Sequence, residues 1–84
     1  MSKYRPLSQW LSNLTTSEVQ VTFEQIEKIL GFELPASART WIAWWENETY
    51  PIRSQCKAWA TAGFYTQQLN LNEQTVVFAK RGSP

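Results

Sequence analysis

The chain of 84 residues contains no histidine and no aspartate, and it has a single cysteine. Without histidine or a cysteine cluster, the common zinc and iron sites cannot form. The seven acidic side chains are all glutamates scattered along the sequence, which argues against a calcium loop or a two-metal carboxylate centre. We therefore expect no metal and no cofactor.

Because histidine and aspartate are absent, the chain lacks side chains that commonly act in catalysis. Serine, threonine and cysteine nucleophiles need a neighbouring base, and no histidine is present to act as one. The three glycines are far apart in the sequence, so they form no glycine-rich phosphate loop. We expect a protein with no catalytic residues, which acts by binding.

Cysteine use and hydropathy indicate a cytoplasmic protein. Cys56 has no second cysteine with which to form an internal disulfide, whereas small extracellular domains usually carry several. The basic start of the chain is not followed by an apolar run long enough for a signal peptide. The longest apolar stretch, residues 41–45, is far too short to cross a bilayer.

Large aromatic residues are plentiful, with five tryptophans, four phenylalanines and three tyrosines. Because each buries about 150–250 Å², they can form a core without disulfides or metal ions. We expect residues 1–81 to form a single domain and residues 82–84 to be a disordered tail. The net charge of +1 is far from that of a strongly basic nucleic-acid-binding protein.

Periodicity and capping signals predict an α+β fold. Helices are expected over residues 4–14, 23–30, 35–42 and 55–62, and strands over 19–21, 64–69 and 75–80. Thr22 and Gln25 have the spacing of a capping box, and Gly31 suits the left-handed stop of a helix. Ser54 is the expected N-cap of the last helix. The prediction is three to four short helices with a small antiparallel sheet, made of an N-terminal short strand and a C-terminal hairpin, in a winged-helix-like arrangement.

Residues 23–45 have the spacing of a helix-turn-helix unit, whose second helix enters the DNA major groove. Ser37, Arg39 and Thr40 would then face outward. A plain helical hairpin over a sheet has the same spacing. The extra helix over residues 55–62 departs from the winged-helix order and leaves open that this helix is the reading element.

Side chains that could contact phosphates or base edges are spread along the second half of the chain. The candidates for nucleic-acid binding are Arg39, Asn47, Arg53, Ser54, Gln55, Lys57, Lys80 and Arg81. Each has an ordinary alternative, as a solvated charge or as part of a capped helix. Duplex DNA is the partner that this set favours.

The tryptophans support a second hypothesis, a protein-interaction module that acts as a small regulator or inhibitor. On one continuous helix, Trp41, Trp44 and Trp45 would share a face, either as core or with one of them exposed. An exposed aromatic patch would suit a protein partner; its expected members are Trp44, Trp45, Tyr50 and Tyr65. A third hypothesis is self-association through the open edge of the hairpin sheet.

Several short motifs follow one another along the chain in a recognisable order. They are Tyr4-Arg5-Pro6-Leu7, Thr22-Phe23-x-x-Ile26-Glu27-x-Ile29-Leu30-Gly31, Leu34-Pro35-x-Ser37-Ala38-Arg39, Trp44-Trp45-x-Asn47, Ser54-Gln55-x-x-Ala58-Trp59, Gly63-Phe64 and Val77-Phe78. This pattern, which covers nearly the whole chain, resembles a family of small bacterial and archaeal domains of unknown function, found alone or appended to nuclease-type proteins. The resemblance implies a nucleic-acid context and no established activity.

Overall fold

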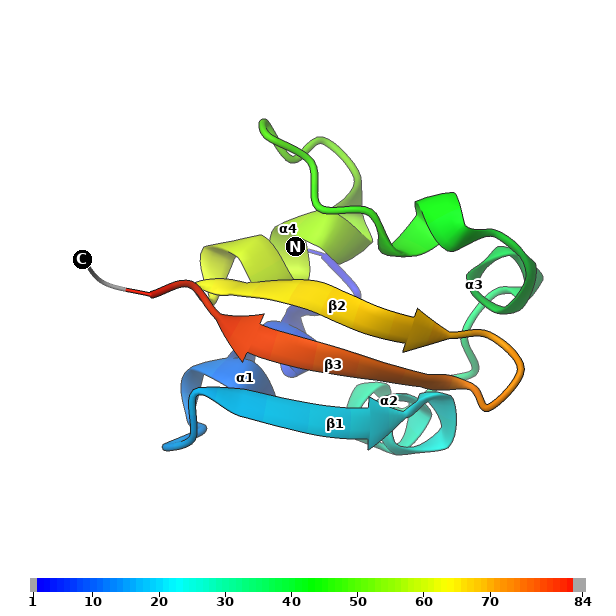
Figure 1. The fold of residues 1–84 in the computed structure, drawn as a ribbon, viewed down its shortest axis with the longest axis horizontal. Helices are drawn as coiled ribbons and strands as arrows, with labels where there is room; N and C mark the ends of the chain where they lie inside the picture. Colours follow the sequence, from blue (N-terminus) through cyan, green and yellow to red (C-terminus); the bar gives the residue numbers. More distant parts are fainter. Residues whose placement is uncertain (1, 83–84) are drawn as a thin grey trace.

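The computed structural model describes residues 2–82, which form four α-helices and a three-stranded antiparallel sheet (Figure 1). In chain order the elements are α1 (Arg5–Ser12), β1 (Glu18–Thr22), α2 (Phe23–Leu30), α3 (Ala36–Thr40), the 3₁₀ helix η1 (Ile42–Trp45), α4 (Ser54–Thr61), β2 (Phe64–Asn70) and β3 (Thr75–Lys80). The expected α+β class is confirmed, with its early strand and its late hairpin. Of the expected tail, residues 83–84 lie outside the described residues.

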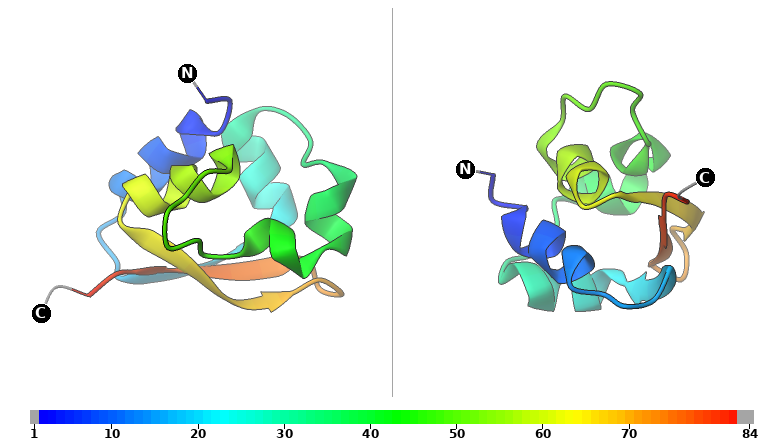
Figure 2. Two further views of the ribbon diagram at one scale, coloured as in Figure 1. Left: turned by 90° about the horizontal axis from the view of Figure 1, so that it is seen from above. Right: turned by 90° about the vertical axis from the view of Figure 1, so that its left-hand side faces the viewer.

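The strand order is β1-β3-β2, so the first strand of the chain pairs with the last and lies at an edge. Both pairings are antiparallel, and Val77 in the central strand lies opposite Gln20 on one side and Gln67 on the other. The helices cover one face of this sheet (Figure 2). Among residues 2–82, no helix or strand covers the other face.

The start and the end of α2 follow directly from local chemistry. The Thr22 hydroxyl accepts from the Gln25 amide at 3.0 Å, and the Gln25 side chain accepts from the Thr22 amide at 2.8 Å. This reciprocal pair is the predicted capping box. Gly31 ends the helix with a φ of 85°, a left-handed conformation that costs glycine little.

The helix predicted over residues 35–42 ends at Thr40, because Trp41 is extended (φ −114°, ψ 117°). The chain then turns into η1, where the Trp45 indole N–H donates to the Ala38 carbonyl at 2.7 Å. A buried indole usually finds such a partner, and this hydrogen bond joins η1 to α3. The three nearby tryptophans therefore do not share one continuous helix. Trp44 and Trp45 point inward, whereas Trp41 is 65% exposed.

Stacked aromatic rings form the centre of the core. The Trp45 ring lies between Phe23, at a centroid distance of 4.8 Å, and Trp59, at 6.0 Å, and is close to parallel with both. Trp44 packs its edge against Trp45, and Tyr4 packs against Trp44 in turn. These contacts join α1, α2, η1 and α4 into one packed layer above the sheet.

The uncovered face of the sheet is polar at its rim. Gln67 of β2 reaches across β3, and its amide donates to the Glu18 carboxylate of β1 at 3.1 Å. Below this bridge, Val77 and Ala79 of the central strand are buried although they point away from the helices. The long polar side chains of the edge strands thus shield the middle of the sheet.

No helix in the described part of the chain is both long enough and apolar enough to cross a membrane.

Candidate functional site

A groove lies between the first half of α1 and one side of α4, along the whole length of α4. It has a volume of about 250 Å³, and the residues that line it are two cationic, four hydroxyl-bearing and one alanine: Arg5, Lys57, Ser2, Ser8, Ser54, Thr61 and Ala58. Most of the surface that they present to the groove is apolar. Among the described residues, no carboxylate lines it. Cationic groups and hydroxyls are the side chains that proteins use most to bind phosphate oxygens.

Core packing places the two helices side by side. On α1, Leu7 and Leu11 are buried, which turns the intervening Ser8 toward the neighbouring helix. On α4, Cys56 and Trp59 are buried, so that Lys57 lies on the outer side. The helices also meet at the surface, where the hydroxyls of Ser8 and Thr61 are 3.3 Å apart.

The sequence around this groove carries cations without acids. Residues 2–17 contain Lys3 and Arg5 and no glutamate, and residues 49–72 contain Arg53 and Lys57 and no glutamate. All seven glutamates lie in the remaining segments. The segments that contain α1 and α4 therefore carry basic residues and no acidic ones, although the whole chain is close to neutral.

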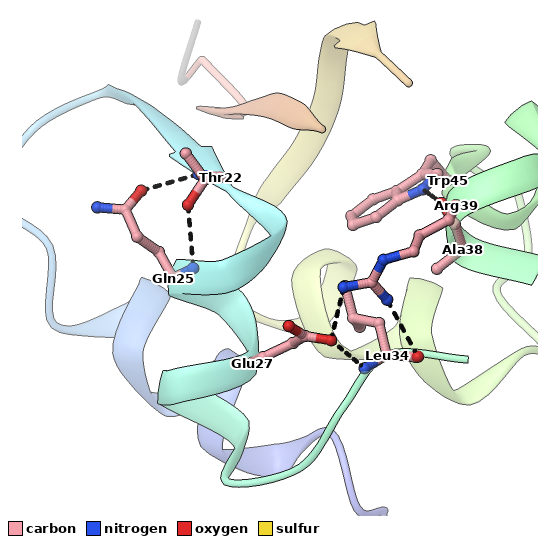
Figure 3. A network of polar contacts seen from close by, with 7 residues as sticks. All are labelled: Thr22, Gln25, Glu27, Leu34, Ala38, Arg39 and Trp45. Carbon is pink, nitrogen blue, oxygen red and sulfur yellow. Dashed lines mark hydrogen bonds and ion pairs between the residues drawn. The ribbon is translucent and has the colours of Figure 1, made fainter. Parts of the chain in front are cut away.

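Arg39 is partly exposed, but its guanidinium is engaged in contacts within the protein. Its guanidinium donates to the Glu27 carboxylate at 2.8 Å and to the Leu34 carbonyl at 3.2 Å (Figure 3). The same carboxylate oxygen accepts from the Leu34 amide at 2.7 Å. The Arg39 hydrogen bond, and then the Leu34 amide, hold the pKa of Glu27 below its ordinary value. This network holds α3 against α2, and it pairs the Arg39 charge, which was expected to contact DNA, with Glu27.

Asn47 and Gln55 also serve the fold. The Asn47 side chain pairs with the backbone of Thr66 on the outer edge of β2, at 2.8 and 2.9 Å. Gln55 is buried on α4, and its amide donates to the Trp44 carbonyl at 3.3 Å. These two amides satisfy buried or edge backbone groups, so the structure does not place them where base edges could be read.

The start of α4 differs from the prediction. Its N-cap is Arg53, Ser54 is its first residue, and no side chain caps it. The Glu48 carboxylate instead accepts from the Ile52 and Arg53 amides, at 3.2 and 3.3 Å, and so holds the turn that leads into the helix. The Arg53 guanidinium donates to the Ala43 carbonyl at 3.0 Å and lies 3.7 Å from Glu48, so its charge is partly compensated.

Lys80 and Arg81 lie exposed at the end of β3. The Arg81 amide donates to the Gly63 carbonyl at 2.8 Å, which places this end of the sheet beside the C-terminus of α4. The Arg81 guanidinium lies 5.7 Å from the centre of the Tyr65 ring, in cation–π contact. Arg81 and Tyr65 line a second, open cleft of about 570 Å³ beside the loop of residues 46–53.

The aromatic patch expected for a protein partner is only partly present. Trp44 and Trp45 are buried in the core, so the structure excludes them from any surface. Tyr65 is half-buried beside Arg81, and Tyr50 is 85% exposed on the loop. Different apolar residues are exposed instead: Trp41, Ile42 and Ile52.

Five groove residues were absent from the sequence-based candidates: Ser2, Arg5, Ser8, Ala58 and Thr61. The absence of acids from residues 2–17 and 49–72 could have identified both halves of the surface. It could not have shown that they meet, because that depends on how α1 packs on α4. Within residues 2–82, no three acidic or cysteine side chains come together as metal ligands would, and Cys56 is buried.

Comparison with known proteins found one family. The family model described as "Domain of unknown function (DUF7662)" matches residues 4–82. Neither the curated proteins nor the solved structures gave a match.

Proposed function

The chain belongs to the DUF7662 family, a domain family of unknown function, and we propose that it is a non-catalytic domain that binds nucleic acid, most favourably duplex DNA, in the cytoplasm. The α1–α4 groove holds the phosphate backbone. The observation that carries this proposal is the lining of that groove, where Arg5, Lys57 and four hydroxyl-bearing residues gather with no carboxylate from residues 2–82.

Phosphate contacts position a protein on a duplex and supply most of its affinity. Arg5 and Lys57 come from different helices, so the groove presents two cations in one hollow rather than along one helix. Ser54 adds a hydroxyl on the same side of α4, whereas the Thr61 hydroxyl donates to the Lys57 carbonyl at 2.7 Å. Arg81 is exposed beside the C-terminal end of α4 and lines a different cleft, where we expect it to add a separate phosphate contact.

The topology supports α4 as the reading helix. The chain begins with α1, β1 and α2, and α4 is followed directly by the β2–β3 hairpin. In the sheet, β1 pairs with β3. This is the order of a winged-helix domain with α3, η1 and a loop inserted before its recognition helix. On that view α4, not α3, approaches the groove of the DNA, which agrees with the internal pairing of Arg39.

The test is a fluorescence anisotropy titration against a labelled mixed-sequence duplex. We expect micromolar binding for the unmodified protein, and a clear loss for Lys57→Ala and Arg5→Ala. The matched control is Lys28→Ala, because Lys28 is an exposed cation on α2, paired with Glu24 and outside the groove. Absence of binding at low salt would reject the function. If only the control variant weakens binding, the α1–α4 groove is not the site that binds DNA.

The second candidate function is protein binding, in which this chain acts as a small regulator or inhibitor of its partner. The loop of residues 46–53 carries Tyr50 and Ile52, which are 85% and 78% exposed. Because the Glu48 carboxylate holds this loop through two amides, Tyr50 and Ile52 are presented from an ordered turn. Aromatic side chains of this kind concentrate at the centre of protein interfaces. Capture of a specific protein by the unmodified chain but not by Tyr50→Ala would favour this candidate.

A further inference from the structure

The open cleft of about 570 Å³ is formed where four parts of the chain meet: the loop of residues 46–53, α4, the start of β2 and the residue after β3. Its volume is within the range of about 300–1,000 Å³ that is usual for small-molecule sites. On α4, Ala60 lines this cleft, whereas Lys57, Ala58 and Thr61 line the α1–α4 groove. Successive helix residues point about 100° apart, so the cleft and the groove lie on different sides of α4.

Arg81 is the cation of this cleft, and its charge is not paired within the protein. The side chain is exposed, and no carboxylate among residues 2–82 lies within ion-pair distance of it. Its guanidinium lies over the Tyr65 ring, 5.7 Å from the ring centre. A guanidinium is planar and carries five N–H donors. With one side against Tyr65, its other side and its donors are available to a ligand.

The remaining polar side chains of the lining are engaged. Asn47 is bonded to the backbone of Thr66. The Glu48 carboxylate accepts from the Ile52 and Arg53 amides and lies 3.7 Å from the Arg53 guanidinium, so its charge is compensated. The cleft therefore offers a ligand one unpaired cation and one aromatic ring, in contact with each other.

We propose that this cleft binds a single unpaired nucleotide, whose base stacks on the Arg81–Tyr65 pair and whose phosphate accepts from the Arg81 N–H groups. Aromatic rings and guanidinium planes are the surfaces on which proteins stack unpaired bases. The in-plane donors of a guanidinium also match the geometry of phosphate oxygens. A nucleotide uses both properties of the pair, whereas inorganic phosphate uses only the charge and a nucleoside only the flat surface.

This site is separate from the one proposed for duplex DNA. Arg81 and Tyr65 do not line the α1–α4 groove, and Arg5 and Lys57 do not line the cleft. The unpaired nucleotide is either a free mononucleotide or part of a single strand, and the open cleft admits both. The inference therefore stands or fails independently of duplex binding.

The test is isothermal titration calorimetry of the unmodified protein, without duplex DNA, against thymidine monophosphate, thymidine and inorganic phosphate. We expect thymidine monophosphate to bind at least about tenfold more tightly than either of the other two, because stacking adds to the charge contact. A short single-stranded oligothymidylate is the fourth probe. If it binds more tightly than the monophosphate, the natural ligand is a strand; if it does not, the ligand is the free nucleotide.

Arg81→Ala should weaken binding of thymidine monophosphate by about tenfold or more, because it removes both the charge and the stacking plane. Tyr65→Ala should weaken it as well. Since Tyr65 is half-buried, Tyr65→Phe is the second variant at this position: it keeps the ring and should bind like the unmodified protein. Circular dichroism should show all three variants to be folded.

The chain offers two matched controls. Lys80→Ala removes the adjacent exposed cation, and Tyr50→Ala removes an exposed tyrosine of the neighbouring loop; neither residue lines the cleft. Both variants should bind thymidine monophosphate like the unmodified protein. The proposal would be overturned if thymidine monophosphate did not bind, if inorganic phosphate bound equally well, or if Lys80→Ala weakened binding as much as Arg81→Ala. Duplex binding without nucleotide binding would overturn this inference alone, and the reverse result would overturn only the proposed function.

Discussion

Asn47 pairs with Thr66 as a neighbouring strand would. The Asn47 amide donates to the Thr66 carbonyl at 2.8 Å, and the Thr66 amide donates back to the Asn47 side-chain oxygen at 2.9 Å. The Thr66 hydroxyl adds a bond of 2.6 Å to the Trp45 carbonyl. A single side chain thus satisfies the outer edge of β2 and ties that strand to the segment that follows η1.

Replacing Asn47 by alanine should destabilise the protein by about 1–2 kcal/mol, because two backbone groups lose their partners. Amide hydrogen exchange at Thr66 should become faster. Asn47→Asp should have an intermediate effect, since the carboxylate can still accept from the Thr66 amide but cannot donate to its carbonyl. Chemical denaturation provides the measurement, with Thr49→Ala in the same loop as control. Equal stability of Asn47→Ala and the unmodified protein would contradict the pairing.

The Glu27–Arg39 pair should make stability depend on pH in the acidic range. Because the pKa of Glu27 is lowered in the folded protein, its carboxylate stabilises the fold above the pKa of the unfolded chain, about 4.3. That contribution is lost as pH falls through the lowered pKa. Glu27→Gln should reduce the pH dependence of the unfolding free energy in this range. An identical pH profile for the two proteins would show that the pair does not contribute.

The salt dependence of DNA binding should report the number of phosphate contacts. Each contact adds about 0.9 to the slope of log affinity against log salt concentration. Lys57→Ala and Arg5→Ala should therefore each reduce the slope by about 1, with similar effects on all duplex sequences. Anisotropy titrations at several salt concentrations give this slope. An unchanged slope with weaker binding would mean that these side chains do not contact phosphate.

Gly31→Ala should destabilise the protein by about 1–2 kcal/mol, the cost of a left-handed conformation for a residue with a side chain. An added Cβ would meet nothing within 4 Å, so the cost comes from the φ of 85° and not from a clash. Gly82→Ala is the matched control, because its Cβ would also meet open space and its φ is not positive. Thermal unfolding should show a lower midpoint for Gly31→Ala alone.

Local signals predicted most of the fold. Thr22, Gln25 and Gly31 determine the limits of α2 through contacts within a few residues, so their effect is visible in the sequence. The strands of the hairpin were predicted for the same reason, since their alternation and the turn between them are local. In contrast, the end of α3 depends on the hydrogen bond from Trp45 to Ala38, which only the packed core makes favourable.

The candidate site was harder to predict because its members are distant in sequence. Arg5 and Lys57 are separated by most of the helical layer and meet through the packing of α1 on α4. Arg39 and Gln55 have the chemistry of DNA contacts, but the fold uses that chemistry internally. Residue type alone does not distinguish an engaged guanidinium from an exposed one.

The stack of Trp45 and Trp59, whose ring planes differ by only 11°, also determines how the protein absorbs light. Two close parallel indoles couple their electronic transitions, and this coupling exists only while the rings stay stacked. Trp59 is 1% exposed, and its indole nitrogen has no hydrogen-bond partner among the described residues, so we expect its emission to be that of an indole in apolar surroundings. Trp41 emits from water. The protein thus carries separate optical reporters of its interior and of its surface.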